Sequence, residues 1–588
     1  MELYPMTTTP VLGGSPQTTK YTSSSGSDVK DNGLPLLTQP SVHVVSAPVP
    51  GMDSADEFVE PFDMQERGSQ RFVAGEAFFN YAQFGSLRPG LEPAELFSRE
   101  YVGLTALFAL NGFGFYFCAF GFGRVLSEYL RDTDAQDVQA VQYVLVWPQC
   151  LTVVMGLLSD SKPLCGLRRK SYILLGLILC AAMCGLVIIV DMTSAHSERI
   201  VNEDPGIASN ATSDSSTGIY ASVLLTLTLL AAFGNQLVLL ACSAMSVELA
   251  QREQLRRRGF IQGTLVAFYN VGRLAALILT AELMEELAED DLTSKISVAG
   301  AAVVLGLSCL VSVPFAVWFL HESASTDSAA THSLKTHTKD FWKFCRGNLA
   351  FRIIAFLIGH LFLIGMFSRN ARDAVSTWSH ISGEDSLYVE VGKLCAMLIS
   401  TLAWVLWFRN HSWRALAILA SLGYVVVYAL LYTLTIFDFV RSRWLYGICI
   451  ALADIPRGWL LLFVLVLSTE VASAGREGAI VGLCISFQTL SGLTCYVIAA
   501  LIPGVSDAEV SEDTSSTRNK VAMSAYGFLA FNLLCLLTIR LLPVQKLDAQ
   551  QLRVFGGYNK FASRILGTVF VVLVIFNLVC NLVVLLSR

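Results

Sequence analysis

The chain has 588 residues, of which 54% are hydrophobic and only 15% are charged, and its formal net charge at pH 7 is −6. Soluble globular proteins are roughly 45–50% apolar and about 25% charged, so the mean hydropathy of +0.55 excludes an ordinary soluble domain. The apolar residues gather in runs of about twenty, the length that a helix needs to cross a bilayer. We therefore expect a polytopic membrane protein that lies in the lipid bilayer.

The first part of the chain has a different composition from the rest. Residues 1–95 contain runs of Ser, Thr, Gly and Pro such as TTTPVLGGSPQTTKYTSSSGSDVK. Such a segment has little apolar surface to bury, and it predicts a disordered cytoplasmic tail. No charged-then-apolar signal peptide follows Met1.

The apolar runs after this tail predict an all-α membrane protein of two six-helix bundles plus one extra C-terminal transmembrane helix. A helix satisfies its own backbone polar groups within lipid. The expected parts are a bundle in 96–320, a cytoplasmic linker in 321–349, a second bundle in 350–543, and a cytoplasmic segment with the extra helix in 544–588. The expected spans are 102–129, 139–158, 172–192, 220–243, 259–281 and 297–320, then 350–368, 387–408, 414–437, 444–468, 478–502, 522–542 and 565–586.

The Lys and Arg residues of the loops predict the orientation. Loops that face inward when the N-terminus is cytoplasmic carry roughly twice as many of these residues as the loops on the other side. The sequon Asn210-Ala-Thr lies in the longest expected exterior loop, where a glycosylation acceptor is usable. The 14 cysteines lie in expected spans or inner loops, which gives no disulfide framework.

The inner joint between spans two and three has the sequence GLLSDSKPLCGLRRKSY. Gly156 allows close helix approach, and Asp160 has the chemistry to accept hydrogen bonds from helix N-terminal amides or to pair with Arg168 or Arg169. This pattern resembles the loop between spans two and three of major facilitator transporters, and it predicts a latch that holds in one conformation. The alternative is plain anchoring of the joint by positive charges.

Spans four and ten end in similar short sequences, which is a weaker sign of an internal repeat. Span four ends in SVE at Glu248, and span ten ends in STE at Glu470, positions that are equivalent in a two-bundle transporter. These carboxylates are candidate latch residues that pair with Arg168, Arg169 or Arg476. The alternative role is proton coupling, since partial burial raises a carboxyl pKa.

Four segments together resemble the folate–biopterin transporters, a branch of the major facilitator superfamily. The segments are GLLSDSKPLCGLRRKSY, FGNQLVLLACSAMSVELAQREQLRRRGFIQG, STEVASAGREGAIVGL and LLPVQK. The resemblance runs from about Tyr101 to the end and includes the extra C-terminal span. It implies transport of folate- or pterin-like solutes with protons. Charged positions of that pattern are replaced here by Thr152, Leu239 and Ser243, which predicts a rebuilt central site.

A few polar side chains inside the spans are candidates for binding the solute. Arg273 has the planar fork that binds carboxylates; alternatively it pairs with Glu282 or Glu285. On the same helix, Tyr269 lies one turn earlier on the same face. These two side chains predict an anion-binding face on span five.

Span ten and span four supply the other candidates. Asp454 and Arg457 flank Pro456 in span ten, where they bind solute or neutralise each other beside a gating bend. Asn235 and Gln236 in span four hydrogen-bond a pterin-like edge or join neighbouring helices. The sequence leaves both roles open for each pair.

Several classes of function are excluded. The sequence has no G-x-x-x-x-G-K-[ST] motif, no metal-ligand spacing and no nucleophile elbow. We therefore expect no enzyme, no metal, no cofactor and no nucleic-acid partner. The resemblance to the folate–biopterin transporters implies a secondary active symporter for a small organic solute in the plasma membrane. The alternatives are a transporter of another solute, such as an amino acid or a nucleoside, and a non-transporting sensor or scaffold.

Overall fold

The computed structural model describes residues 86–88, 91–129, 135–203, 213–288, 291–322, 334–502 and 505–586. Thirteen helices in these ranges are long and apolar enough to cross a membrane. They match the thirteen predicted runs, and the predicted fold class is confirmed. Most of the predicted tail and Asn210 lie outside the described residues.

The first bundle contains six spans, two of which are interrupted. Span one changes to a π-helical turn within its Gly- and Phe-rich run, and span two has a 3₁₀ turn at Pro148, which lacks a backbone donor. The elements are α3 (Val102–Tyr116), η3 (Phe117–Phe122), α4 (Gly123–Tyr129), α5 (Ala135–Val146), η4 (Trp147–Leu151), α6 (Thr152–Ser161), α7 (Lys170–Glu203), α8 (Ser213–Ala250), α9 (Phe260–Glu282) and α10 (Val298–Trp318).

A short antiparallel hairpin between α9 and α10 was not predicted. Its strands are β1 (Met284–Ala288) and β2 (Asp291–Ser294), and Met284 pairs with Ser294. The hairpin lies outside the spans, so it leaves the helical membrane region unchanged.

The second bundle follows the amphipathic linker helix α11 (Leu334–Phe344). Serine and threonine side chains cap several of its helices, as at Ser368 and Ser382. Its elements are α12 (Asn348–Gly365), α13 (Arg369–Trp378), α14 (Gly383–Ala403), η6 (Trp404–Phe408), α15 (Trp413–Ile436), α16 (Arg443–Val471), α17 (Glu477–Leu501), α18 (Asp507–Glu512), α19 (Ser515–Asn532), α20 (Cys535–Thr538) and η7 (Ile539–Leu541). After it come α21 (Lys546–Phe555) and the extra span α22 (Ala562–Leu586).

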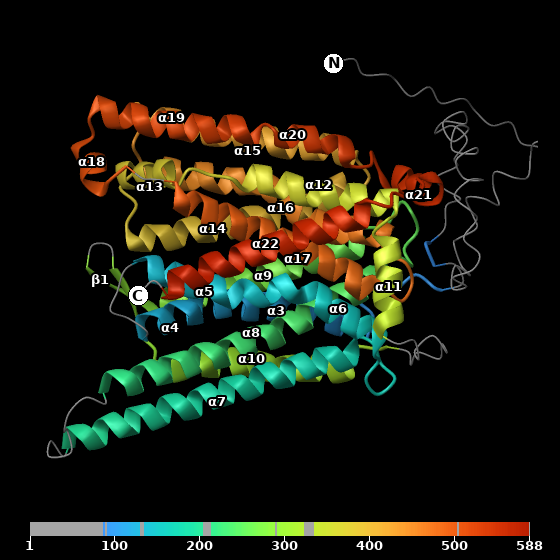
Figure 1. Ribbon diagram of the computed structural model, residues 1–588, viewed down its shortest axis with the longest axis horizontal. Coiled ribbons are helices and arrows are strands. Elements are labelled where there is room, and N and C mark those ends of the chain that lie inside the picture. The colour runs from blue at the N-terminus through green and yellow to red at the C-terminus, as the bar shows by residue number, and fades with distance from the viewer. Residues whose placement is uncertain are drawn as a thin grey trace, which may run out of the picture. The chain divides into compact units, whose positions relative to one another are not determined.

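The two bundles meet along two seams. Helix α6 packs on α17, and α9 packs on α14 (Figure 1). Spans two and eleven thus face each other, as do spans five and eight. Helix α22 lies across the first seam, in contact with both α5 and α17. Its Asn577 donates to Thr494 Oγ1 of α17 at 2.8 Å.

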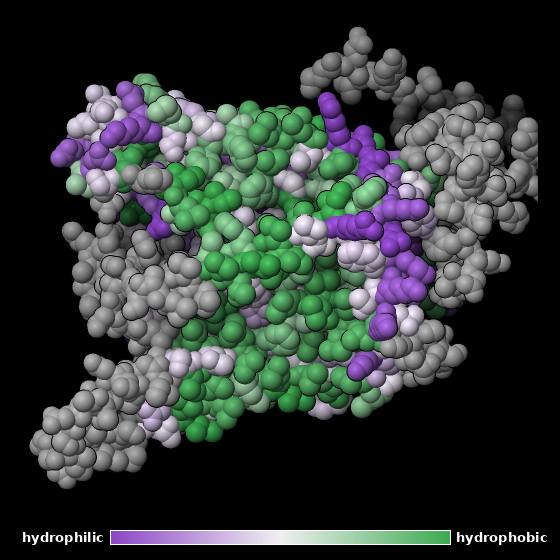
Figure 2. Space-filling model, viewed as in Figure 1, coloured by the Kyte–Doolittle hydropathy of each residue, from purple (hydrophilic) through white to green (hydrophobic). Residues whose placement is uncertain are grey.

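The two ends of the helices differ in content. One end, which we name the linker end, holds α11, α21 and the loops 162–169, 251–259, 409–412 and 472–476. The opposite end, which we name the hairpin end, holds β1, β2, α13 and α18 (Figure 1). Figure 2 shows a hydrophobic belt between hydrophilic residues that gather mainly at the linker end. This belt is what lipid contact requires.

Candidate functional site

Arg273 lies on α9 at the seam with α14. Its Nη1 donates to Asn270 Oδ1 at 3.3 Å and lies 3.6 Å from the Sδ atom of Met397 across the seam. The guanidinium also lies 5.5 Å from the ring centroid of Tyr116 on α3. Glu282, one of the two acids considered from the sequence, is not among these partners, and the side chain of Glu285 lies outside the described residues. Arg273 therefore reaches the space between the bundles.

Two ion pairs of the second bundle lie near this arginine. Lys393 Nζ is 2.5 Å from Glu390 Oε1 on α14, and Arg457 Nη1 is 3.7 Å from Asp454 Oδ1 on α16. Glu390 also lies within electrostatic range of Arg273 and Arg457, and Lys393 lies within range of Asp454. We name these five residues the central cluster. With three cations and two carboxylates, its formal charge is 3 − 2 = +1.

The head of Arg457 opens toward the protein interior rather than toward lipid. Its side chain is 54% exposed, whereas the lipid-facing side of α16 is marked by Leu452 and Ile448. At 100° per residue, Arg457 lies about 140° around the helix from Leu452. Its guanidinium therefore faces away from the lipid-facing side of α16.

Tyrosines surround the central cluster. Arg457 lies within electrostatic range of Tyr424 and Tyr428 on α15 and of Tyr496 on α17. The Tyr496 ring lies 5.1 Å from the ring of Tyr143 in the first bundle. Guanidinium groups beside aromatic rings are suited to bind a flat molecule that carries a negative group.

The other predicted binding residues are engaged in helix packing. Asn111 Nδ2 donates to both the backbone oxygen of Asn235 at 2.8 Å and its Oδ1 at 2.9 Å. Gln236 is buried in the same helix. The backbone of Tyr269 is pressed against Gly112, where any Cβ would clash. In this conformation, Asn235 joins α8 to α3.

At the linker end, an ion cluster closes the α6–α17 seam. Asp160 Oδ1 is 2.7 Å from Arg169 Nη2, and Arg169 Nη2 also lies 3.0 Å from Glu477 Oε2. The Asp160 carboxylate accepts from the backbone N–H groups of Gly478 at 3.2 Å and Ala479 at 2.7 Å, in the first turn of α17. We name Asp160, Arg169 and Glu477 the linker-end ion cluster. All three are buried.

The backbones of α6 and α17 touch just behind this cluster. A Cβ at Gly156 would lie 2.5 Å from the carbonyl carbon of Gly478. One turn further along α17, Gly482 faces the backbone of Thr152, whose Oγ1 donates to the Gly482 oxygen at 2.9 Å. The predicted close approach at Gly156 therefore takes place between the two bundles.

Glu470 of α16 has a different partner from those considered from the sequence. Arg258, in the loop before α9, donates from Nη1 to both Glu470 oxygens at 3.1 Å. Nearby, Gln262 Nε2 donates to Thr469 Oγ1 at 2.5 Å, and Gln251 Nε2 donates to the Ala472 oxygen at 2.8 Å. This second group also joins the two bundles.

The partners predicted for Glu248 and Glu470 were wrong. Neither carboxylate pairs with Arg168, Arg169 or Arg476. Arg476 Nη2 lies 3.7 Å from Asp340 of α11. The backbone N–H groups of Arg168 and Arg169 donate to the Glu322 carboxylate at 2.8 and 3.0 Å, where Glu322 caps the start of α7. Arg168 thus anchors the joint through its backbone.

Glu248 pairs instead with a residue from the predicted tail. Arg88 Nη1 lies 3.2 Å from Glu248 Oε1, its Nε donates to Gln251 Oε1 at 2.9 Å, and its Nη2 donates to Glu477. Arg88 therefore connects α8 of one bundle to α17 of the other. The contact of Arg88 with both bundles was not predicted, because Arg88 is a single arginine in a segment predicted to be disordered.

Two buried titratable groups lie at the loop between α8 and α9: Glu253 belongs to the loop, and Lys546 packs against it. Lys546 Nζ donates to the backbone oxygens of Leu255 and Arg258 at 3.3 and 2.7 Å and to Asn410 Oδ1 at 3.1 Å. Burial lowers the pKa of Lys546 to about 7. Burial likewise raises the pKa of Glu253 to about 7, although its carboxylate accepts from Gly259 N–H at 3.0 Å.

No cluster of three or more His, Cys, Asp or Glu side chains arranged to hold a metal ion is present among the residues described in the structure.

Comparison with known proteins gives matches among solved structures alone. No family model matches the chain, and no curated protein matches it. A bacterial homologue of the iron transporter ferroportin, in its outward-facing state, is 15% identical with a TM-score of 0.49 and covers 75% of this chain and 97% of its own. The proton:xylose symporter XylE, of the major facilitator superfamily, is 12% identical with a TM-score of 0.49 and covers 74% and 94%. The major facilitator transporter FucP is 10% identical with a TM-score of 0.47 and covers 75% and 97%.

Proposed function

We propose that this chain is a secondary active transporter that moves a small organic solute by alternating access. The observation that carries this proposal is the central cluster, to which Arg273 comes from the first bundle and the two ion pairs Glu390–Lys393 and Asp454–Arg457 come from the second. A charged site shared by two bundles changes its exposure when the bundles rock against each other.

The contacts at the linker end support a state closed on that side. The linker-end ion cluster and the Arg258–Glu470 pair both join the two bundles there. Opening this end requires these buried pairs to separate and become hydrated. We infer that the linker end faces the cytoplasm, because its loops carry the larger share of Lys and Arg.

The cargo that we propose is a folate- or pterin-like anion, which the resemblance in the four sequence segments implies. The formal charge of +1 in the central cluster favours an anion. Arginine forks at Arg273 and Arg457 match carboxylate geometry. Tyr116 and Tyr496 offer ring faces for a flat heterocycle.

We propose that protons are co-transported through Glu390. Its carboxylate competes with an anionic cargo for Arg273 and Arg457, both of which lie within its electrostatic range. Protonation of Glu390 would raise the charge of the central cluster from +1 to +2 and release those two cations. A doubly negative cargo such as folate then matches the site, and bound cargo favours bound proton.

Uptake of labelled folate and biopterin into cells that express the full chain tests this function. Arg273→Ala should reduce uptake by at least tenfold, since one charge-assisted hydrogen bond contributes about 1.5–3 kcal/mol. Arg256→Ala, at an exposed loop position, is the matched control and should transport normally. Glu390→Gln should remove the dependence of uptake on an imposed pH gradient.

A different outcome would favour another function. Normal amounts of protein in the membrane without uptake of pterins, amino acids or nucleosides at any pH would support a sensor or scaffold. Uptake of an amino acid or nucleoside in place of pterins, lost in Arg273→Ala, would keep the transporter and replace the cargo.

A further inference from the structure

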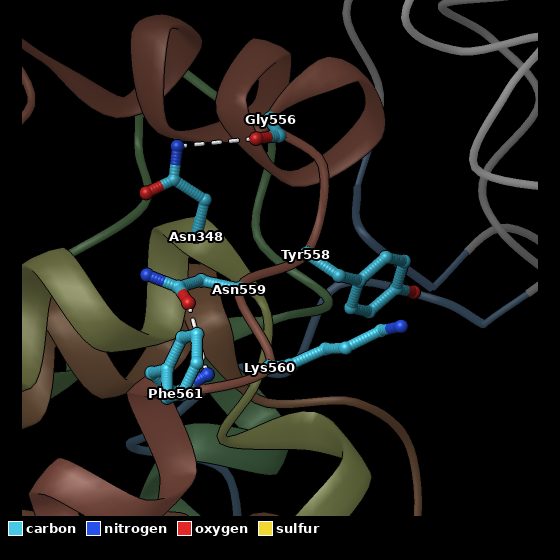
Figure 3. A pocket seen from close by; sticks show the side chains of 6 residues that line it. All are labelled: Asn348, Gly556, Tyr558, Asn559, Lys560 and Phe561. Carbon is cyan, nitrogen blue, oxygen red and sulfur yellow. Dashed lines mark hydrogen bonds between the residues drawn. The ribbon is translucent and has the colours of Figure 1, made fainter.

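A cavity lies at the linker end where two spans begin. Its volume is about 540 Å³ and its lining residues are Asn348, Gly556, Tyr558, Asn559, Lys560 and Phe561 (Figure 3). Asn348 is the first residue of the seventh span, and the thirteenth span begins at Ala562. The cavity therefore lies at the level where both helices enter the hydrocarbon region.

Hydrogen bonds hold the walls of this cavity. Asn348 Nδ2 donates to the Gly556 oxygen at 3.1 Å, and Asn559 Oδ1 accepts from Phe561 N–H at 2.9 Å. Asn559 N–H donates to the Arg346 oxygen at 2.8 Å. The side chains of Tyr558 and Lys560 extend in the same direction from this frame (Figure 3). Lys560 is thus a cation on a fixed backbone.

An exposed apolar track begins at the mouth of the cavity. Phe561, directly before α22, is 64% exposed, and α22 continues with exposed Ile565, Val572 and Ile575. The ring of Trp342 from α11 packs where a Cβ at Gly567 would be, and tryptophan is typical of the membrane–water boundary. A cationic cavity that continues into a lipid-facing track fits an amphiphile with an anionic head.

We propose that this cavity binds the headgroup of an anionic phospholipid, whose acyl chains lie along the exposed face of α22. The phosphate accepts from Lys560 and faces the positive N-terminal end of α22. The aromatic ring of Phe561 lies at the glycerol level. Because α22 contacts α17 and α5 through its other face, the lipid would lie on the outer side of α22.

Thermal unfolding of the purified full chain in detergent micelles tests this site. The micelles are titrated with dioleoyl phosphatidylserine, and dioleoyl phosphatidylcholine or inorganic phosphate replaces it in parallel titrations. Phosphatidylserine should raise the melting temperature, and Lys560→Gln should shift the midpoint of that titration about fivefold to higher lipid. Lys560→Arg should keep the midpoint. Lys343→Gln, at an exposed lysine of α11 outside the cavity lining, is the matched control.

The titrations separate the possible results. An effect of phosphatidylserine that Lys560→Gln weakens and Lys343→Gln leaves unchanged supports the proposal. An equal effect of phosphatidylcholine, or an equal midpoint in Lys560→Gln, overturns the headgroup site. Stabilisation by inorganic phosphate to the same extent overturns the lipid as its occupant. None of these readouts depends on transport.

Discussion

Asp160→Asn is the change that tests most directly how the linker end is closed. The carboxylate of Asp160 is buried, pairs with Arg169 at 2.7 Å and accepts two backbone N–H groups of α17. An asparagine keeps the shape, but its NH₂ group faces a donor and its neutrality leaves Arg169 less compensated. Breaking a buried pair in this way costs about 3–5 kcal/mol. This cost falls on the closed state, because in the open state water solvates these groups.

A free energy of this size converts into a population. At about 1.4 kcal/mol for each factor of ten, Asp160→Asn should raise the fraction of molecules open at the linker end about 100-fold or more. Glu248→Gln is the control, since Glu248 is 30% exposed and its ion pairs with Arg88 and Arg252 are 3.2 and 3.6 Å long. An exposed pair contributes about 0–1 kcal/mol, so its effect should stay below about fivefold.

The assay is labelling, in the detergent-purified full chain, of a cysteine at position 152, introduced as Thr152→Cys, by a water-soluble maleimide. Thr152 is fully buried between α6 and α17, so only the open state reacts. The background carries Cys165→Ser, which removes the exposed native thiol. Equal labelling rates in Asp160→Asn and Glu248→Gln would refute the argument that the buried cluster holds this end closed.

Three further predictions concern the same end of the molecule. Gly156→Ala should raise cysteine labelling and abolish uptake because its methyl group meets backbone of α17, whereas Gly185→Ala, with open space around it, should do neither. Arg88→Ala should raise labelling about tenfold, since it loses hydrogen bonds to charged groups; an unchanged rate would show that the segment is dispensable. The melting temperature should fall between pH 4.5 and 7, because the pKa of folded Glu253 is raised to about 7, and rise above pH 7, because the pKa of folded Lys546 is lowered to about 7. Glu253→Gln should flatten the first limb and Lys546→Met the second, and a profile that both variants leave unchanged would contradict this assignment.

The helices were predictable because each span is a local pattern. The apolar run 102–129 corresponds to the span Val102–Glu128, and 414–437 corresponds to Trp413–Ile436. Gly156 and Asp160, at the inner joint between spans two and three, were also predictable, because they belong to a short sequence motif. Hydropathy within a window of about twenty residues is enough to place the spans, and the motif is read within a few residues.

The partners of the predicted residues were not predictable in the same way. Asp160 contacts Ala479, which is 319 positions away, and no local pattern encodes that distance. Lys393 pairs with Glu390 at a spacing of three. That i, i+3 spacing was a usable signal, because such neighbours share a helix face. Arg88 gave no such signal.

The thirteenth helix imposes a condition on any motion of the bundles. Asn577 fastens α22 to Thr494 of α17, and the ring of Phe570 lies edge-on against Phe487 of the same helix at 5.5 Å. Toward α5 it presents an apolar surface that includes Leu573 and Val574. If α17 and α5 separate, α22 moves together with α17 and slides over α5. If the bundles move as the proposed function requires, the extra helix would keep lipid tails out of the seam while it opens and closes.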